Sequence, residues 1–294
     1  MDVEQCRGRV RNCQGDPCRA RAWQRTALVK HALILLLVTV PAAAQELFPR
    51  FSVTGGAYFG NFSTDARVDP AAAAGGGEGT ALNIERDLGL ESRKDLRRLT
   101  AQWRPLNRHE LAGSWFTSSR TGFANIDREI RFRDSIYPVR AAVTTGFDLD
   151  YWDATYTYWA RKSESDGFGV MLGAAGLKLD AVVTAQAEGQ SVAATQRAST
   201  DVPVAMIGAQ TRVAIIPNLI FEASGAALPH VTLDQYSGRA LSAGARLEYR
   251  IVRAVGIGAA YNYFRLDGNV DTTGLRGNLK MRVDGAEAYL RLGW

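Results

Sequence analysis

Few side chains in this 294-residue sequence have the type and spacing that catalysis requires. Beyond residue 44 only two histidines occur, His109 and His230, and Asp234 follows His230 by four positions. A histidine that acts as an acid or base needs partners held within hydrogen-bond reach, and no nucleophile motif accompanies this pair. We therefore expect an isolated loop histidine at position 230 and no catalytic residue.

Ligation of a metal or a phosphate has equally little support. The segment FDLDYWD places Asp148 and Asp150 on one face of a strand and Asp153 on the other, because successive strand residues point to opposite faces. Such oxygen ligands suit calcium, but a solvated strand end explains them as well. The glycine-rich segment 71–79 lacks the Gly-Lys-Ser/Thr of a phosphate loop. We expect no metal and no cofactor.

A larger group of charged residues occurs at alternate positions within otherwise apolar runs. In a dry protein core, unpaired charges of this kind would be prohibitively costly. What they do therefore depends on the elements that carry them. The group comprises Arg98, Arg212, Glu222, Arg246, Glu248, Arg250, Glu287 and Arg291.

The elements that carry these charges are predicted to be strands, because the apolar residues from Phe51 onward recur every second position and not at helical spacing. The breaks between runs divide the chain into about ten antiparallel strands, and eight or twelve remain alternatives because 78–90 and 123–134 could be strands or loop hairpins. The expected strands are 51–64, 95–104, 109–124, 144–161, 167–184, 201–216, 219–230, 238–251, 254–267 and 280–294.

The connections differ in length on the two sides of the predicted sheet. Short breaks such as Pro217-Asn218 join strands in pairs, and longer polar or glycine-rich segments make the other connections. This asymmetry is typical of a transmembrane antiparallel up-and-down β-barrel. Several strands exceed the roughly 10 residues needed to span a membrane, so they should project beyond it. The expected long connections are 66–93, 131–140, 185–199, 231–237 and 268–278.

The first 44 residues have the features of a secretory leader. Basic residues precede an apolar run at 32–40, and Ala42 and Ala44 form a small-residue cleavage site. Cleavage after Ala44 would leave 45–294 as the barrel domain. All three cysteines lie within the first 18 residues, with spacing that does not fit a zinc site. Beyond the leader 28 basic and 27 acidic residues remain, so we expect no nucleic-acid partner.

A soluble β-sandwich is the main alternative fold, since its strands alternate in the same way. The leader, the asymmetric connections and the absence of cysteine beyond the leader favour the barrel. Aromatic residues near the predicted strand ends agree, because amphipathic rings gather at membrane interfaces. They are Trp103, Trp115, Tyr156, Tyr158, Tyr249, Tyr261 and Tyr263.

The closing segment AEAYLRLGW, 286–294, resembles the C-terminal signal by which bacterial outer-membrane β-barrel proteins are recognised for assembly. Leu290, Leu292 and Trp294 carry this resemblance, and Tyr289 stands where a glycine is usual. Segments 79–90, 156–162 and 247–268 are similar to uncharacterised outer-membrane proteins related to the OmpA-like and porin-family small barrels. The resemblance implies a Gram-negative outer membrane, surrounding lipid and lipopolysaccharide, and the barrel-assembly machinery as partners. It brings no catalytic residues.

We therefore expect a monomeric, non-enzymatic barrel with a structural or surface-interaction role in the envelope. About ten strands enclose an interior little wider than its side chains, so the charges are expected to pair and fill it. A narrow passive channel lined by these charges is the alternative. A surface hydrolase that uses His230 is a more distant one.

Overall fold

The computed structural model describes residues 47–69, 78–126, 128–132, 135–137, 141–186, 194–233, 236–271 and 276–294. All of them belong to one compact unit, Ala44–Trp294. The expected leader, 1–44, lies outside the described residues, as do Asp234 and most of the glycine-rich segment 71–79.

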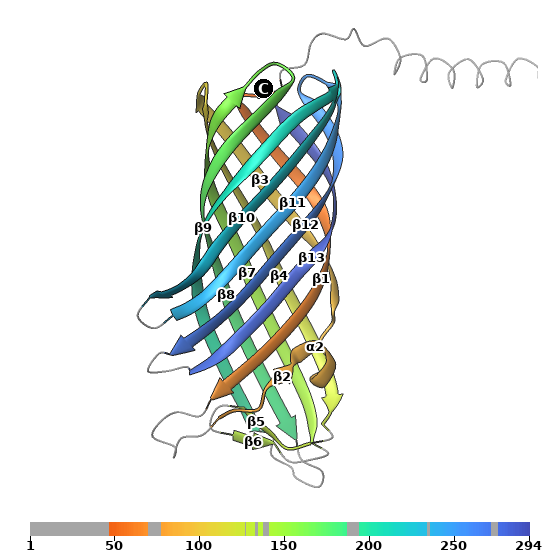
Figure 1. The fold of residues 1–294 in the computed structure, drawn as a ribbon. Coiled ribbons are helices and arrows are strands. Elements are labelled where there is room, and N and C mark those ends of the chain that lie inside the picture. Colours follow the sequence, from red (N-terminus) through yellow and green to blue (C-terminus); the bar gives the residue numbers. More distant parts are fainter. Residues whose placement is uncertain are drawn as a thin grey trace, which may run out of the picture. The chain divides into compact units, whose positions relative to one another are not determined.

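The described residues are almost entirely strands (Figure 1). The elements are β1 (Phe51–Asp69), β2 (Leu82–Asn83), α2 (Ile84–Asp87), β3 (Arg93–Leu106), β4 (His109–Asn125), β5 (Ile130–Phe132), β6 (Ser135–Tyr137), β7 (Ala142–Lys162), β8 (Asp166–Gln186), β9 (Ala194–Ile216), β10 (Leu219–Leu233), β11 (Tyr236–Val252), β12 (Val255–Asp271) and β13 (Arg276–Gly293). No helix in this part of the chain is long and apolar enough to cross a membrane.

Ten strands form a closed antiparallel ring, in the order β1, β3, β4, β7, β8, β9, β10, β11, β12 and β13. The ring closes because β13 pairs with β1 from Ser52↔Gly293 to Asp69↔Arg276 without interruption. Pairing along the wall is not complete everywhere: β3 pairs with β4 only as far as Leu99↔Trp115, and β9 pairs with β10 only as far as Ala227↔Ile207, so the loop-end parts of these strands are unpaired on those sides. The short β2 is added beside β1, and β5 pairs only with β6. The predicted up-and-down barrel of about ten strands is confirmed.

The barrel has a turn end and a loop end. At the turn end, two- or three-residue connections join β3 to β4, β7 to β8, β9 to β10 and β11 to β12. At the loop end, the expected long connections at 185–199, 231–237 and 268–278 are wrong, because the strands extend far into them. Residues in these extensions are small or polar on the outward face, so the sequence there shows little alternation of apolar and polar residues.

The two segments considered as extra strands do not join the ring as full members. Within 78–90, only the two residues of β2 pair with β1, and α2 follows, with the Asn83 side chain accepting a hydrogen bond from the Arg86 amide at 2.9 Å. Gly89 then turns the chain with φ 68°, where a Cβ would clash with the carbonyl of Phe123. Within 123–134, β4 continues to Asn125, and Ile130–Phe132 forms β5, which pairs with β6 and not with the ring.

Outward-facing residues next to the turn end form an apolar band. It includes alternate residues of 51–59, 168–176, 255–263 and 286–294, with exposed side chains such as Leu172, Ile257 and Leu290. These segments have about the length that a strand needs to cross the hydrocarbon core of a bilayer. We call this part of the barrel the turn half and the remainder the loop half.

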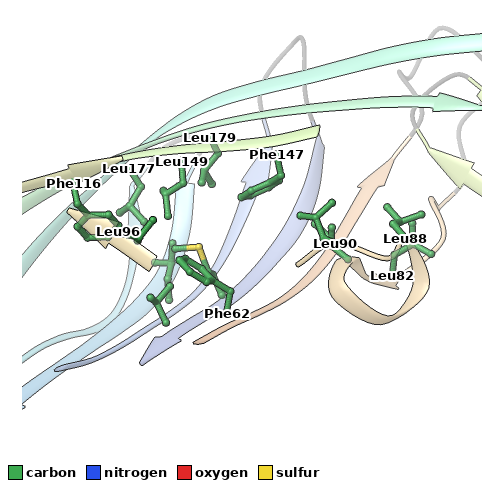
Figure 2. Packing of buried hydrophobic residues seen from close by; sticks show 14 of the residues in the cluster. Phe62, Leu82, Leu88, Leu90, Leu96, Phe116, Phe147, Leu149, Leu177 and Leu179 are labelled. Carbon is green, nitrogen blue, oxygen red and sulfur yellow. The ribbon is translucent and has the colours of Figure 1, made fainter. Parts of the chain in front are cut away.

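In the loop half the polarity of the wall is reversed. On β13, Lys280 and Arg282 face outward while Met281 and Val283 are buried inside. The buried apolar residues inside the loop half form one hydrophobic cluster, which also contains Leu82, Ile84, Leu88 and Leu90 from the segment around α2 (Figure 2). The loop half is therefore built like a water-soluble protein, with an apolar interior and a polar surface.

Candidate functional site

The charged residues singled out in the sequence lie on the lumen face of the turn half. Strand register brings several of them side by side, since Glu222 pairs with Arg212 of β9 on one side and with Arg246 of β11 on the other. Residues opposite one another on neighbouring strands have their Cβ atoms about 5 Å apart, close enough for ion pairs. Strand register alone therefore places acidic side chains beside basic ones, independently of any contact across the lumen.

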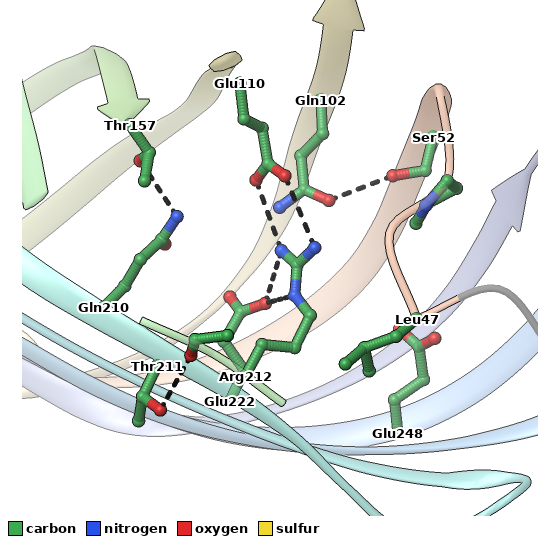
Figure 3. Close-up of polar contacts among 12 residues, drawn as sticks. Leu47, Ser52, Gln102, Glu110, Thr157, Gln210, Thr211, Arg212, Glu222 and Glu248 are labelled. Carbon is green, nitrogen blue, oxygen red and sulfur yellow. Dashed lines mark hydrogen bonds and ion pairs between the residues drawn. The ribbon is translucent and has the colours of Figure 1, made fainter. Parts of the chain in front are cut away.

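Arg212 is the centre of the network (Figure 3). Its Nε donates to Glu222 Oε2 at 2.7 Å, and its Nη2 lies 3.2 Å from Glu110 Oε1, across the lumen on β4. The side chains of Arg212 and Glu110 are each 4% exposed. A guanidinium buried to this degree needs such partners, because removing a charge from water costs several kcal/mol. Glu110, which the sequence analysis did not identify, completes the site.

A second group lies beside the first. Arg250 Nε donates to Glu248 Oε1 at 2.9 Å, and Arg291 Nη1 lies 3.6 Å from the same oxygen. Arg246 places its guanidinium 5.0 Å from the ring centre of Tyr289. One carboxylate thus serves two arginines, so the group is compact and leaves little room for a path between the side chains.

Arg98 and Glu287 are the loosest members of the predicted set. Their closest atoms, Arg98 Nη1 and Glu287 Oε2, are 3.8 Å apart, and Asn262 donates to the same carboxylate at 3.0 Å. All eight predicted residues face the lumen, but only those on β9, β10, β11 and the end of β13 come together closely.

The chain just before β1 closes the turn end from inside. Leu47 and Phe48 are buried there, and Phe48 meets Trp159 edge-on with ring centres 4.8 Å apart. Arg104 donates to the Phe48 carbonyl, and Arg250 Nη2 donates to the Leu47 carbonyl at 3.4 Å. The sequence analysis missed this segment, because nothing in its pattern shows that it turns back into the lumen.

We use the term plug for these two ion-pair groups together with the Leu47–Phe48 segment and Trp159. The space left inside the plug is about 20 Å³, lined by Arg212, Glu222, Arg250 and their neighbours. A cavity needs about 10–15 Å³ to hold one water molecule, so the plug has room for about one or two. Among the described residues, the side chains of the plug leave little unfilled space in this part of the lumen.

A second buried ion pair lies in the loop half. Arg120 Nη1 lies 2.8 Å from Glu85 Oε1, and the Arg120 guanidinium stacks over the rings of Phe62 and Phe147. The amide of Thr64 also donates to Glu85, at 2.7 Å. The pair fixes the segment around α2 to the inner wall. Sequence reasoning missed it, because Glu85 lies in a segment with no strand register to pair it with β4.

Asp87, in the same segment, lies on the polar side of α2. The hydrogen bond from Arg86, followed by that from the Asn83 amide and the charge of Arg128, holds the pKa of Asp87 below its usual range against the opposing effect of burial. Asp87 is therefore ionised at neutral pH and anchors the short helix to its own N-terminus and to Arg128.

The predicted interfacial aromatics all face outward. Trp103, Trp115, Tyr158, Tyr249 and Tyr261 are exposed, and Tyr156 and Tyr263 are half-buried. The predicted assembly residues also lie in the band: Leu290 and Leu292 are exposed, and Trp294 packs against Phe51 with ring centres 4.9 Å apart.

The remaining candidates lie apart from the plug. His109 faces outward and its Nδ1 lies 2.7 Å from the Tyr156 hydroxyl, while His230 is exposed at a register shift in β10. Asp148 and Asp150 are exposed on the outer wall, and Asp153 faces the lumen, where Ser114 donates to it. Across the described residues there is no group of three His, Cys, Asp or Glu side chains placed to hold a metal ion.

No family model matches the chain, and no curated protein matches it. Among solved structures, the outer membrane protease OmpT from Escherichia coli is similar with a TM-score of 0.52 and 8% identity, over 83% of this chain and 97% of that one. The attachment protein Ail of Yersinia pestis matches with a TM-score of 0.31 and 13% identity, over 81% and 97% of the two chains. A Pseudomonas aeruginosa FadL homologue matches with a TM-score of 0.35 and 9% identity, over 85% and 96%.

At these identities the likeness concerns the fold, and of the three only the similarity to OmpT is close enough to carry an argument. It agrees with what the strands show independently, namely ten antiparallel strands in a closed ring with an outward apolar band of membrane thickness. The chain has the fold of an outer-membrane β-barrel.

Proposed function

We propose that this protein is an integral, non-conducting barrel of the Gram-negative outer membrane, exported by its leader, with a non-enzymatic role at the cell surface. The observation that carries the proposal is the plug. Arg212, Glu110 and Glu222 join β4, β9 and β10 across the lumen with contacts of 2.7–3.2 Å. A selectivity lining needs an open pore between its charges, and here the charges bond to one another.

The loop half supports the same proposal. A passive channel would need a water-filled path through this half as well, and its interior holds Phe62, Phe116, Phe147 and the leucines around α2. Water does not fill narrow apolar interiors readily. The alternative of a narrow channel for small solutes is therefore disfavoured at both ends of the lumen.

The distant alternative of a surface hydrolase has little to support it. OmpT is named a protease, but at 8% identity its activity does not transfer to this chain. Both described histidines, His109 and His230, lie outside the lumen. The buried ion pair of Glu85 with Arg120 in the loop half includes no histidine that could act as a general base.

The proposed partners follow from the outer surface. The apolar band suits bilayer lipid. Basic residues of β12 and β13 that lie next to the band on the loop-half side, such as Arg265 and Arg282, suit the anionic groups of lipopolysaccharide. The barrel-assembly machinery, which would recognise the last strand, is the remaining proposed partner. Because β13 pairs with β1 along its whole length, no second copy is needed to close the ring, which supports a monomer.

Conductance in planar bilayers tests the proposal. Wild-type protein, shown to be inserted by protection of its turn half from protease, should give no stepwise current at moderate voltage. The physical reason is that ions would have to cross both the plug and the apolar loop half. Discrete, reproducible conductance steps from inserted protein would contradict the proposal and favour the channel.

A further inference from the structure

The lumen of the loop half contains an unfilled space. A cavity of about 140 Å³ lies between α2 and the loop-end segments of β1 and of β7 to β13. Its deep wall consists of buried apolar side chains, including Phe147, Leu179, Val204 and Leu266. Two smaller spaces follow toward the turn end, about 60 Å³ beside Phe116 and about 20 Å³ in the plug. Of these three spaces, the one at the loop end has the largest volume.

The cavity exists because small residues face inward at this level. Ala66, Ala181 and Ala198 line it, and glycines occupy the inward positions 238 and 268 on neighbouring strands. The pairing of Ala181 with Ala198 in the register of β8 and β9 leaves a gap that two larger side chains would fill. Protein interiors are normally packed to the density of organic crystals, so a space of this size in a hydrophobic cluster is unusual.

The walls determine what kind of molecule the cavity could hold. Three arginines stand at its rim, and each is already paired: Arg67 with Asp69 at 3.1 Å, Arg239 with Asp267 at 3.1 Å and Arg276 with Asp271 at 3.0 Å. Among the described residues that line the cavity, no charged side chain is left unpaired for an ionic ligand, and the deep wall offers an ion no partner. For an uncharged apolar ligand, leaving water is itself favourable, and the ligand would in addition gain van der Waals contacts on several sides.

Size restricts the ligand further. An apolar cavity of about 150 Å³ is large enough to stay dry and to bind a benzene molecule. We propose that the loop-half cavity binds one small uncharged hydrocarbon group, the size of a single aromatic ring or a short alkyl segment. Such a group could be a free hydrocarbon that enters from the loop end, or the alkyl end of a lipid.

Photolabelling in native outer membranes tests this inference. The probe is a phenyl trifluoromethyl diazirine, which is small, uncharged and reacts with neighbouring side chains after irradiation. Labelling should map to lumen residues such as Val202 and Val204, and it should saturate. Outward residues of the apolar band, such as Ile207 on the same strand, should label in simple proportion to probe concentration, because they contact bulk lipid.

Two competitors identify the source of the ligand. If benzene alone suppresses the lumen labelling, a free hydrocarbon is the ligand; if a lysophospholipid suppresses it too, the alkyl chain of a lipid also enters. Either result supports the cavity as a binding site. Lumen labelling that is absent, or that neither competitor reduces, would overturn the inference.

Matched variants of β9 separate the cavity from the surrounding wall. Ala198→Phe, which fills the cavity, should reduce saturable labelling at least about tenfold, equivalent to about 1.4 kcal/mol of binding. Ser199→Phe places the same ring on the outward face one residue away and should leave labelling unchanged. If Ala198→Phe does not fold, Ala181→Leu fills part of the same space with less overpacking. Unchanged lumen labelling in a folded cavity-filling variant would rule out the site. The test does not depend on conductance, so its outcome is independent of the proposed closure.

Discussion

The turn half and the loop half of this barrel share the same strands and differ in which face is apolar. On β13, the outward residues Leu290 and Leu292 of the turn half give way to Lys280 and Arg282 in the loop half. The inward residues change in the opposite sense, from Glu287 and Arg291 to Leu279, Met281 and Val283. The two-residue period continues through the change, so the strand keeps its twist and register while its environment is inverted.

The difference shows that one wall can be adapted to two solvents. Where lipid surrounds the wall, apolar side chains face out, and the polar groups gather in the lumen, where they must bond to one another. Where water surrounds it, polar side chains face out and the hydrophobic effect packs the lumen instead. The different character of the plug and the cavity follows from this inversion. The plug lies in the polar lumen of the turn half, and the cavity lies in the apolar lumen of the loop half.

Removing the central cation of the plug should have the largest effect. Arg212→Met leaves Glu110 and Glu222 buried without their shared partner, and we expect the free energy of unfolding to fall by about 3–5 kcal/mol. Denaturant unfolding of protein reconstituted in lipid vesicles measures this. The matched control replaces all three residues, as Arg212→Met with Glu110→Leu and Glu222→Leu, and should recover most of the loss. If Arg212→Met left the free energy of unfolding unchanged, water would have to reach these carboxylates, and the turn-half lumen would be wet.

Sequence periodicity was sufficient to predict the ring and the inward direction of the turn-half charges. In segments such as 241–251, apolar residues alternate strictly with charged residues, serine or glycine, so the face to which each position belongs is visible there. In the loop half, stretches such as 194–200 mix small and polar residues on both faces, so their pattern predicts a loop although β9 begins at Ala194. The two-residue periodicity of a sequence reveals a strand only where the two faces of that strand differ strongly in polarity.

Contacts across the lumen could not be predicted in the same way. Glu110 and Arg212 lie on β4 and β9, which are separated by β7 and β8 in the sheet, and they meet only because of the barrel's diameter, tilt and stagger. The same holds for Leu47 and Phe48, which lie before the first strand. Sequence register predicts neighbours within the wall, and closure of the wall determines which residues meet across it.

A positive charge on the outer wall should distinguish the two halves directly. Leu172→Arg and Val182→Arg both place an arginine on the outward face of β8, the first within the apolar band and the second in the loop half. We expect the first to lower the free energy of unfolding in lipid vesicles by about 2–4 kcal/mol and the second by about 0–1 kcal/mol. The contrast arises because only residue 172 would contact hydrocarbon. Equal costs would show that the apolar band does not mark the bilayer.

The last comparison concerns two tryptophans of the turn half and should have the smallest effect on stability. Trp115 and Trp294 both face outward, 53% and 66% exposed, but only Trp294 ends the chain. Each alanine variant removes a ring of similar exposure, so the two free energies of unfolding should change by similar, small amounts. If Trp294 also serves as the assembly signal, Trp294→Ala should in addition lower the amount of folded protein reaching the outer membrane several-fold, measured by the folded band in cell-envelope fractions, while Trp115→Ala should not. Equal amounts of folded protein from the two variants would show that Trp294 is an ordinary interfacial residue and not an assembly signal. Because its amide and carbonyl bond to Phe51 at 3.0 and 2.9 Å, a variant that keeps the backbone tests the side chain without opening the seam between β1 and β13.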